Sequence, residues 1–111
     1  MGRTPIDNFP EKFMEVKNHL DLITRECHCT TWLNHWKRSQ PQKEHPNCSV
    51  YNCTKMAHAG GHVTLCDEPN SQVYIIPMCL HHNATFGRSL KIKKNTTLVS
   101  WKYQDTCQDK V

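Results

Sequence analysis

Cysteine and histidine side chains are concentrated in the middle third of this chain. The sequence holds seven cysteines and eight histidines among 111 residues, and many of them lie between Cys27 and His82. Thiolate and imidazole groups are the preferred ligands of structural zinc sites, which take four of them in a tetrahedron. Disulfides would explain the cysteines but not the histidines, and an odd cysteine count leaves one unpaired. The composition therefore favours a metal site.

Two close pairs of these residues have the spacing of a zinc site. Cys48 and Cys53 are separated by four residues, and Cys79 and His82 by two. The first spacing suits a loop, and the second suits the first turn of a helix, so that both side chains of each pair can reach one ion. We predict that these four residues form a Cys3His zinc site.

A second group of ligands is also predicted. Cys27 and Cys29 are two positions apart, so on an extended strand their sulfurs lie on one face. His35 follows in the next predicted helix. His62 is the first choice for the fourth ligand, with His58 in reserve. The prediction is therefore one or two structural zinc ions.

The alternative for this second group is a role in the core. Cysteine is among the most often buried residue types, so Cys27 and Cys29 can be ordinary buried thiols and His35 a hydrogen-bonded core histidine. Cys66 and Cys107 have no close partner in the sequence and are predicted to be free thiols.

The compartment decides between metal and disulfides. Asn-x-Ser/Thr sequons at Asn47, Asn52, Asn83 and Asn95 are the best argument for secretion. However, the N-terminal residues lack the apolar core of a signal peptide, and no apolar run approaches the roughly 20 residues of a membrane span. We expect an intracellular protein, in cytoplasm or nucleus, with no membrane contact and reduced cysteines.

The elements that must position these residues suggest a small α+β domain over residues 1–111. Phe13, Val16, Leu20 and Ile23 form one apolar stripe, which predicts an amphipathic helix at about 8–25. The segment "TTWLNHWKRS" predicts a second helix, capped by Thr30 or Thr31.

The remaining elements are predicted strands and one short helix. "AGGHVTL" and "SQVYIIPMC" have the β-branched and aromatic residues of a β-hairpin, and "CLHHNATF" reads as a short helix or turn beginning at Cys79. These elements give a core over about 27–87. Residues 88–104 alternate well enough to predict a C-terminal hairpin.

The string "C…C…GGHV…YIIPMCLHHN" resembles treble-clef zinc modules and, among them, the HNH or ββα-metal nucleases. The resemblance runs from Cys48 to about Gly87. The fuller set of motifs, C-x-C, W-L-x-H-W, G-H-V and P-x-C-x-x-H-N, is also similar to small zinc-binding proteins to which we can attach no activity. The resemblance implies a zinc-stapled treble-clef core made of a β-hairpin and a short helix.

Carried over to this chain, the HNH pattern assigns roles to several residues. His62 matches the general base, Cys79 and His82 match the zinc knuckle, and Asn83 matches a ligand of the catalytic metal. Gly61 stands where the family has Asp or His as a further metal ligand. Without that ligand the divalent ion that phosphodiester hydrolysis requires would be poorly held. We expect the nuclease centre to be lost, and a metal-dependent endonuclease using His62 and Asn83 is the alternative.

The charge of the chain suggests a partner. Its net charge is +4, and the last quarter is rich in basic residues, namely Arg88, Lys91, Lys93, Lys94 and Lys102. A basic hairpin beside a zinc knuckle predicts contact with DNA or RNA. A solvated hairpin edge explains the same residues. The third possibility is a platform that binds a protein partner or a second copy of the chain, with Trp32 and Trp36 at the interface.

Overall fold

The computed structural model describes residues 13–19, 29–41, 44–68 and 72–102. In this part of the chain five strands form one antiparallel sheet and two short helices flank it. The elements are β1 (Phe13–His19), α1 (Trp32–Arg38), β2 (Ala59–Leu65), β3 (Tyr74–Met78), α2 (Leu80–Asn83), β4 (Ser89–Lys93) and β5 (Val99–Ser100). The predicted small α+β class is confirmed.

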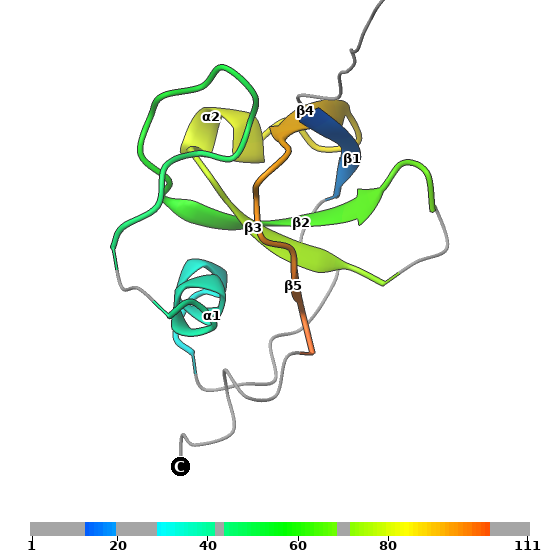
Figure 1. The fold of residues 1–111 in the computed structure, drawn as a ribbon. Helices are drawn as coiled ribbons and strands as arrows, with labels where there is room; N and C mark the ends of the chain where they lie inside the picture. Colours follow the sequence, from blue (N-terminus) through cyan, green and yellow to red (C-terminus); the bar gives the residue numbers. More distant parts are fainter. Residues whose placement is uncertain (1–12, 20–28, 42–43, 69–71, 103–111) are drawn as a thin grey trace, which may run out of the picture.

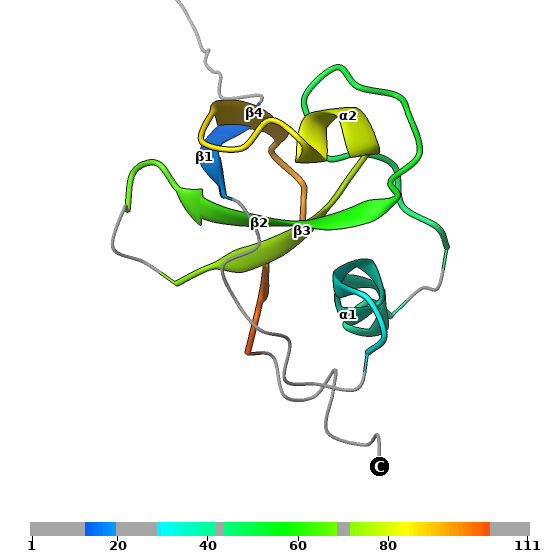
Figure 2. The same ribbon diagram turned by 180° about the vertical axis from the view of Figure 1, so that it is seen from behind.

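The sheet has the strand order β4-β1-β2-β3-β5. The β2–β3 hairpin lies at its centre, with Ala59 opposite Met78 and Val63 opposite Tyr74. Figure 1 and the reverse view in Figure 2 place α1 on one side of this hairpin and α2, with β1 and β4, on the other. The predicted central hairpin and the short helix after Cys79 are confirmed.

The predicted N-terminal helix is wrong over residues 13–19, because these residues form β1; the rest of that prediction lies outside the described residues. Val16 and Asn18 are buried, whereas Lys17 between them and Glu15 before them are exposed. This alternation with a period of two is the pattern of a strand. Strand β1 pairs with both β2 and β4, so tertiary pairing overrides the helical spacing of the apolar residues.

The predicted C-terminal hairpin is also wrong. Strand β4 pairs with β1, and β5 pairs with β3, so the two strands lie at opposite edges of the sheet. Each strand finds its hydrogen-bonding partner in a strand that is distant in sequence. The connection between them crosses the molecule instead of turning back.

The loop that carries Cys48 and Cys53 closes the space between β3 and β4. The backbone N–H of Ser49 donates to the carbonyl of Pro77 at 2.9 Å, and the carbonyl of Ser49 accepts from the backbone N–H of Lys93 at 2.9 Å. A bridge between Val50 and Ile92 extends this contact. The loop therefore acts as an additional short strand over the core.

The main core lies beneath this loop. It is built from buried apolar residues of several strands and of the loop itself: Val16, Cys48, Val50, Val63, Ile76, Met78, Cys79 and Ile92. Two of the predicted ligands are thus part of the core. Burial of a thiol suits zinc binding, because water is kept from the sulfur.

Helix α1 packs on the opposite side of the hairpin. Thr31 caps it, its side-chain oxygen accepting from the backbone N–H of Asn34 at 3.0 Å, as the sequence predicted. The helix approaches β2 closely at Gly60, where an added Cβ would lie 2.5 Å from the backbone carbon of Trp32. Glycine is therefore required there by space.

In the part of the chain that the structure describes, no helix has both the length and the apolar character needed to cross a membrane.

Candidate metal centre

The four residues predicted to share one ion lie together. The Sγ atoms of Cys48, Cys53 and Cys79 and a ring nitrogen of His82 are all within 4.8 Å of one another. They come from two parts of the fold, the loop over the core and the beginning of α2. Within the described ranges this is the only group of three or more Cys, His, Asp or Glu side chains that converges in this way.

The distances in this group fit a tetrahedral ion. The Nδ1 atom of His82 lies 3.3 Å from the Sγ of Cys79 and 3.8 Å from the Sγ of Cys48. A tetrahedron with Zn–S of about 2.3 Å and Zn–N of about 2.0 Å places sulfur and nitrogen about 3.5 Å apart. The donor set of three sulfurs and one imidazole is also one that zinc accepts.

The loop half of the centre is shaped by a tight turn. Asn52 adopts a positive φ of 69°, and the backbone N–H of Cys53 donates to the carbonyl of Val50 at 3.0 Å. Asparagine tolerates this left-handed conformation better than most residues. The turn brings Cys53 back beside Cys48, although four residues separate them.

The ammonium group of Lys93 holds this turn from β4. Its Nζ donates to the carbonyl of Cys48 at 2.8 Å and to the carbonyl of Cys53 at 2.9 Å. Sequence reasoning assigned Lys93 to a nucleic-acid surface. The side chain is instead directed inward, at the two residues that would bind metal.

The helical half of the centre is shaped by the first turn of α2. Cys79 is its N-cap, with Sγ accepting from the backbone N–H of His82 at 3.5 Å. Asn18 holds the other end of this turn, its Nδ2 donating to the carbonyls of His82 and Asn83 at 3.3 and 3.2 Å. A buried asparagine in β1 thereby fixes the helix that presents His82.

The protonation of these groups suits a metal ion. Burial raises the pKa of the Cys48 thiol to about 11. Burial opposes ionisation of Cys79 as well, but hydrogen bonds from the backbone N–H of His82 and from the Cys48 and Cys53 thiols outweigh it and lower the pKa of Cys79. Burial, together with the charges of His81 and Lys55, lowers the pKa of His82. Cys79 therefore ionises more readily than Cys48, and burial disfavours protonation of the His82 imidazole beside it.

The described residues do not complete a four-ligand site from the second predicted group. Cys27 lies outside them, and Cys29, His35 and His62 alone do not converge on one point. The three side chains are buried near α1, and the ring of Trp32 contacts both imidazoles, with centroids 5.2 Å from His35 and 4.9 Å from His62. The second zinc ion remains a prediction.

His35 shows a feature of a core histidine. Its Nε2 lies 2.9 Å from the carbonyl of Ser100, and because a carbonyl only accepts, Nε2 carries the proton. Burial lowers the pKa of His35, which keeps the ring neutral. These contacts tie α1 to β5.

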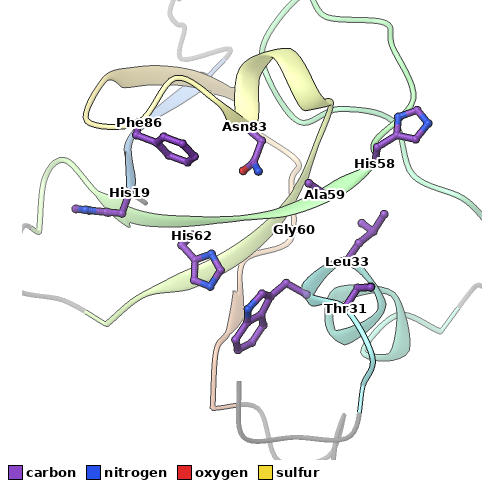
Figure 3. A pocket seen from close by; sticks show the side chains of 10 residues that line it. His19, Thr31, Leu33, His58, Ala59, Gly60, His62, Asn83 and Phe86 are labelled. Atoms are coloured by element: carbon purple, nitrogen blue, oxygen red, sulfur yellow. The ribbon is translucent and has the colours of Figure 1, made fainter. Parts of the chain in front are cut away.

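The residues assigned to the nuclease centre line one pocket. Figure 3 shows Asn83 and Phe86 entering it from the side of α2, and His62 lying below β2 on the side of α1. The pocket has a volume of about 340 Å³ and is also lined by His19 and His58. His62 and Asn83 thus approach it from opposite faces of the sheet.

The position before His62 is closely packed. A Cβ on Gly61 would lie 2.8 Å from the Sδ of Met78 and 3.0 Å from the Oδ1 of Asn83. The space that an aspartate or histidine would need is filled by these two side chains. An aspartate or histidine at position 61 would therefore require Met78 and Asn83 to shift.

The five basic residues do not form one face. Lys102 follows β5, at the opposite edge of the sheet from β4, and its Nζ lies 5.3 Å from the ring centroid of Trp101. Lys93 is engaged by the loop, and Lys91 lies over the ring of Phe13 at 5.0 Å. The basic hairpin surface expected from the sequence is therefore divided.

No protein-family model matches the chain, and comparison with curated proteins and with solved structures finds no match either.

Two residues that support the centre were missed by sequence reasoning. Lys93 reads as one of several lysines in a basic strand, and Asn18 reads as a polar position in a helix. The alternation of apolar Met14 and Val16 with charged Glu15 and Lys17 could have indicated a strand and placed Asn18 on its inner face. No signal in the sequence pairs Lys93 with Cys48 and Cys53, because they lie 45 and 40 positions away along the chain.

Proposed function

We propose that this chain is a zinc-stabilised module in which Cys48, Cys53, Cys79 and His82 hold one structural ion. The observation that carries the proposal is the convergence of all four ligand atoms within 4.8 Å. The ion would join the loop to α2, two segments that contribute to the same core. Four protein ligands leave no open position for substrate, so the role is structural and not catalytic.

The test is metal content per chain after purification without added metal, followed by thermal unfolding with and without a chelator. We expect at least one zinc ion and a large loss of stability on chelation. Cys79→Ser should abolish binding at this centre. Cys66→Ser is the matched control, because Cys66 lies away from the cluster with its Sγ 3.8 Å from the Oγ of Ser89. A protein without metal, or equal losses in the two variants, would refute the proposal.

Contact with DNA or RNA is a further part of this proposal. The basic residues near β4 that are not engaged by the loop, such as Arg88 and Lys91, are the candidates for phosphate contact. Anisotropy of a labelled oligonucleotide should then rise on binding, and the affinity should fall steeply with salt because neutralised phosphates release counterions. Salt-insensitive self-association in the same buffers would favour the protein platform instead.

A metal-dependent endonuclease is the second candidate, because His62 and Asn83 line the same pocket. The assay is cleavage of plasmid DNA with magnesium, manganese or nickel. Given the packing around Gly61, we expect no cleavage above a chelated control. Cleavage that disappears in His62→Ala and persists in His58→Ala would establish this activity.

A further inference from the structure

Lys93 stands in an unusual relation to the proposed centre. Its backbone N–H donates to the carbonyl of Ser49, and its ammonium group donates to the carbonyls of Cys48 and Cys53, all within 2.9 Å. One residue of β4 thus binds the loop at three points. No other described side chain is shown to hold both cysteines of the loop.

The charge of this group matters as well as its hydrogen bonds. A zinc ion with three thiolates and a neutral imidazole carries a net negative charge. Such a charge in a partly buried site is costly unless a positive group lies near it. The Lys93 ammonium is held against the residues that carry two of the three sulfurs.

We propose that Lys93 is a positioning residue of the zinc centre, which sets the separation of Cys48 and Cys53 and compensates the negative charge of the metal-bound thiolates. This inference rests on the proposed zinc site. It gives a function within the fold to a lysine that the sequence placed on a nucleic-acid surface. Partners of this kind around a metal site change metal affinity by about 10- to 100-fold when they are removed.

The experiment compares Lys93→Met with Lys91→Met and Lys93→Arg. Methionine keeps much of the aliphatic stem of lysine but removes the ammonium group. Lys91 is the matched control, since it lies two residues earlier on the same face of β4 and contacts Phe13 instead of the loop. The affinity for zinc is measured by competition with a chelating dye.

We expect Lys93→Met to weaken zinc binding by about 10-fold or more, whereas Lys91→Met and Lys93→Arg stay within about 2-fold of the unchanged chain. Lys93→Met with unchanged affinity would overturn the inference. A wild-type chain that takes up neither zinc nor cobalt would overturn the zinc site itself, so the two failures are distinguishable.

A second readout separates this role from simple support of the fold. Cobalt in place of zinc gives a sulfur-to-metal charge-transfer band, and this band is recorded only from chains that have bound the ion. Loss of a nearby positive charge raises the energy of the sulfur electrons, so the band of Lys93→Met should move to longer wavelength. Lys93→Arg should restore its position. Identical bands in all variants would show that Lys93 does not act on the thiolates.

Discussion

Cysteines and histidines lie on both sides of β2, but the two sides arrange them differently. Gly61 faces Met78 and Asn83, on the side where Cys48, Cys53, Cys79 and His82 converge. Gly60 and His62 face Trp32, on the side where Cys29 and His35 are buried. The first side brings its ligand atoms to one point, whereas the second packs its imidazoles against an indole. Within the described ranges, the two sides are thus distinguished by the convergence of their ligand atoms and not by their content of cysteine and histidine.

The largest expected contrast between the two sides is in metal dependence. Cys79→Ser should remove the ion of the first side, and structural zinc contributes about 10 kcal/mol or more to the folded form of small zinc domains. Cys29→Ser should leave at least one zinc ion bound and preserve cooperative unfolding. Elemental analysis and thermal unfolding of both variants provide the measurement.

Two outcomes of that experiment would change the comparison. Loss of all zinc in Cys29→Ser would mean that the two sides do not act independently. Two ions in the unchanged chain and one in Cys29→Ser would establish the second site predicted from the sequence, completed by residues beyond those described.

The glycines of β2 test how tightly each side is packed. Gly60→Ala should cost about 2–3 kcal/mol of unfolding free energy, because its Cβ would meet the backbone of α1, which cannot move without moving the helix. Gly61→Ala should cost about 1 kcal/mol, since the flexible Met78 side chain can shift. Urea unfolding of both variants at saturating zinc measures the difference. Equal costs would show that α1 is less firmly seated than the structure indicates.

The residues that hold the two helices should differ in importance. Asn18→Ala removes buried hydrogen bonds to the carbonyls of His82 and Asn83, and should cost about 2 kcal/mol. Thr31→Ala removes an exposed cap of α1 and should cost about 1 kcal/mol. Only Asn18→Ala should also weaken zinc binding, measured by dye competition. Weakened binding in Thr31→Ala would link α1 to the Cys3His centre.

The smallest expected effect is a pH dependence on the α1 side. Burial lowers the pKa of His35 below its ordinary 6.5, against the opposing effect of the Ser100 carbonyl. The unfolded chain therefore binds the proton more readily, and the stability that neutral His35 contributes is present above pH 6.5 and is lost as the pH falls through the lowered value.

This dependence is measured as the difference in unfolding free energy between the unchanged chain and His35→Gln. The difference should be largest at about pH 7.5 and smaller at about pH 5.5. Acid also releases zinc from thiolates, but it does so in both chains and cancels in the difference. A difference that grows toward acid pH would contradict a buried neutral imidazole.

Local signals in the sequence were sufficient for several elements. Thr31 before an amphipathic segment predicted the start of α1, and the β-branched run before Cys79 predicted β3 and the turn into α2. The spacings of Cys48 with Cys53 and of Cys79 with His82 suggested the two halves of one centre. Each of these signals depends on residues within a few positions of one another.

The remaining features depend on which distant segments meet. Helical spacing of Phe13 and Val16 predicted a helix, but the edges of β2 and β4 made the same residues a strand. The pairing of β4 with β1 and of β5 with β3 separates these two strands. In this position β4 directs Lys93 toward the loop that carries Cys48 and Cys53.

The sequence by itself therefore determined the ligand types, their close pairs and the local elements that carry them. Only the tertiary structure decided that the pairs converge, that Asn18 and Lys93 support them, and that His62 lies on the other face of β2. The physical reason is that caps, turns and ligand spacings are fixed by short-range geometry. Strand partners are chosen by burial and hydrogen bonding summed over the whole sheet.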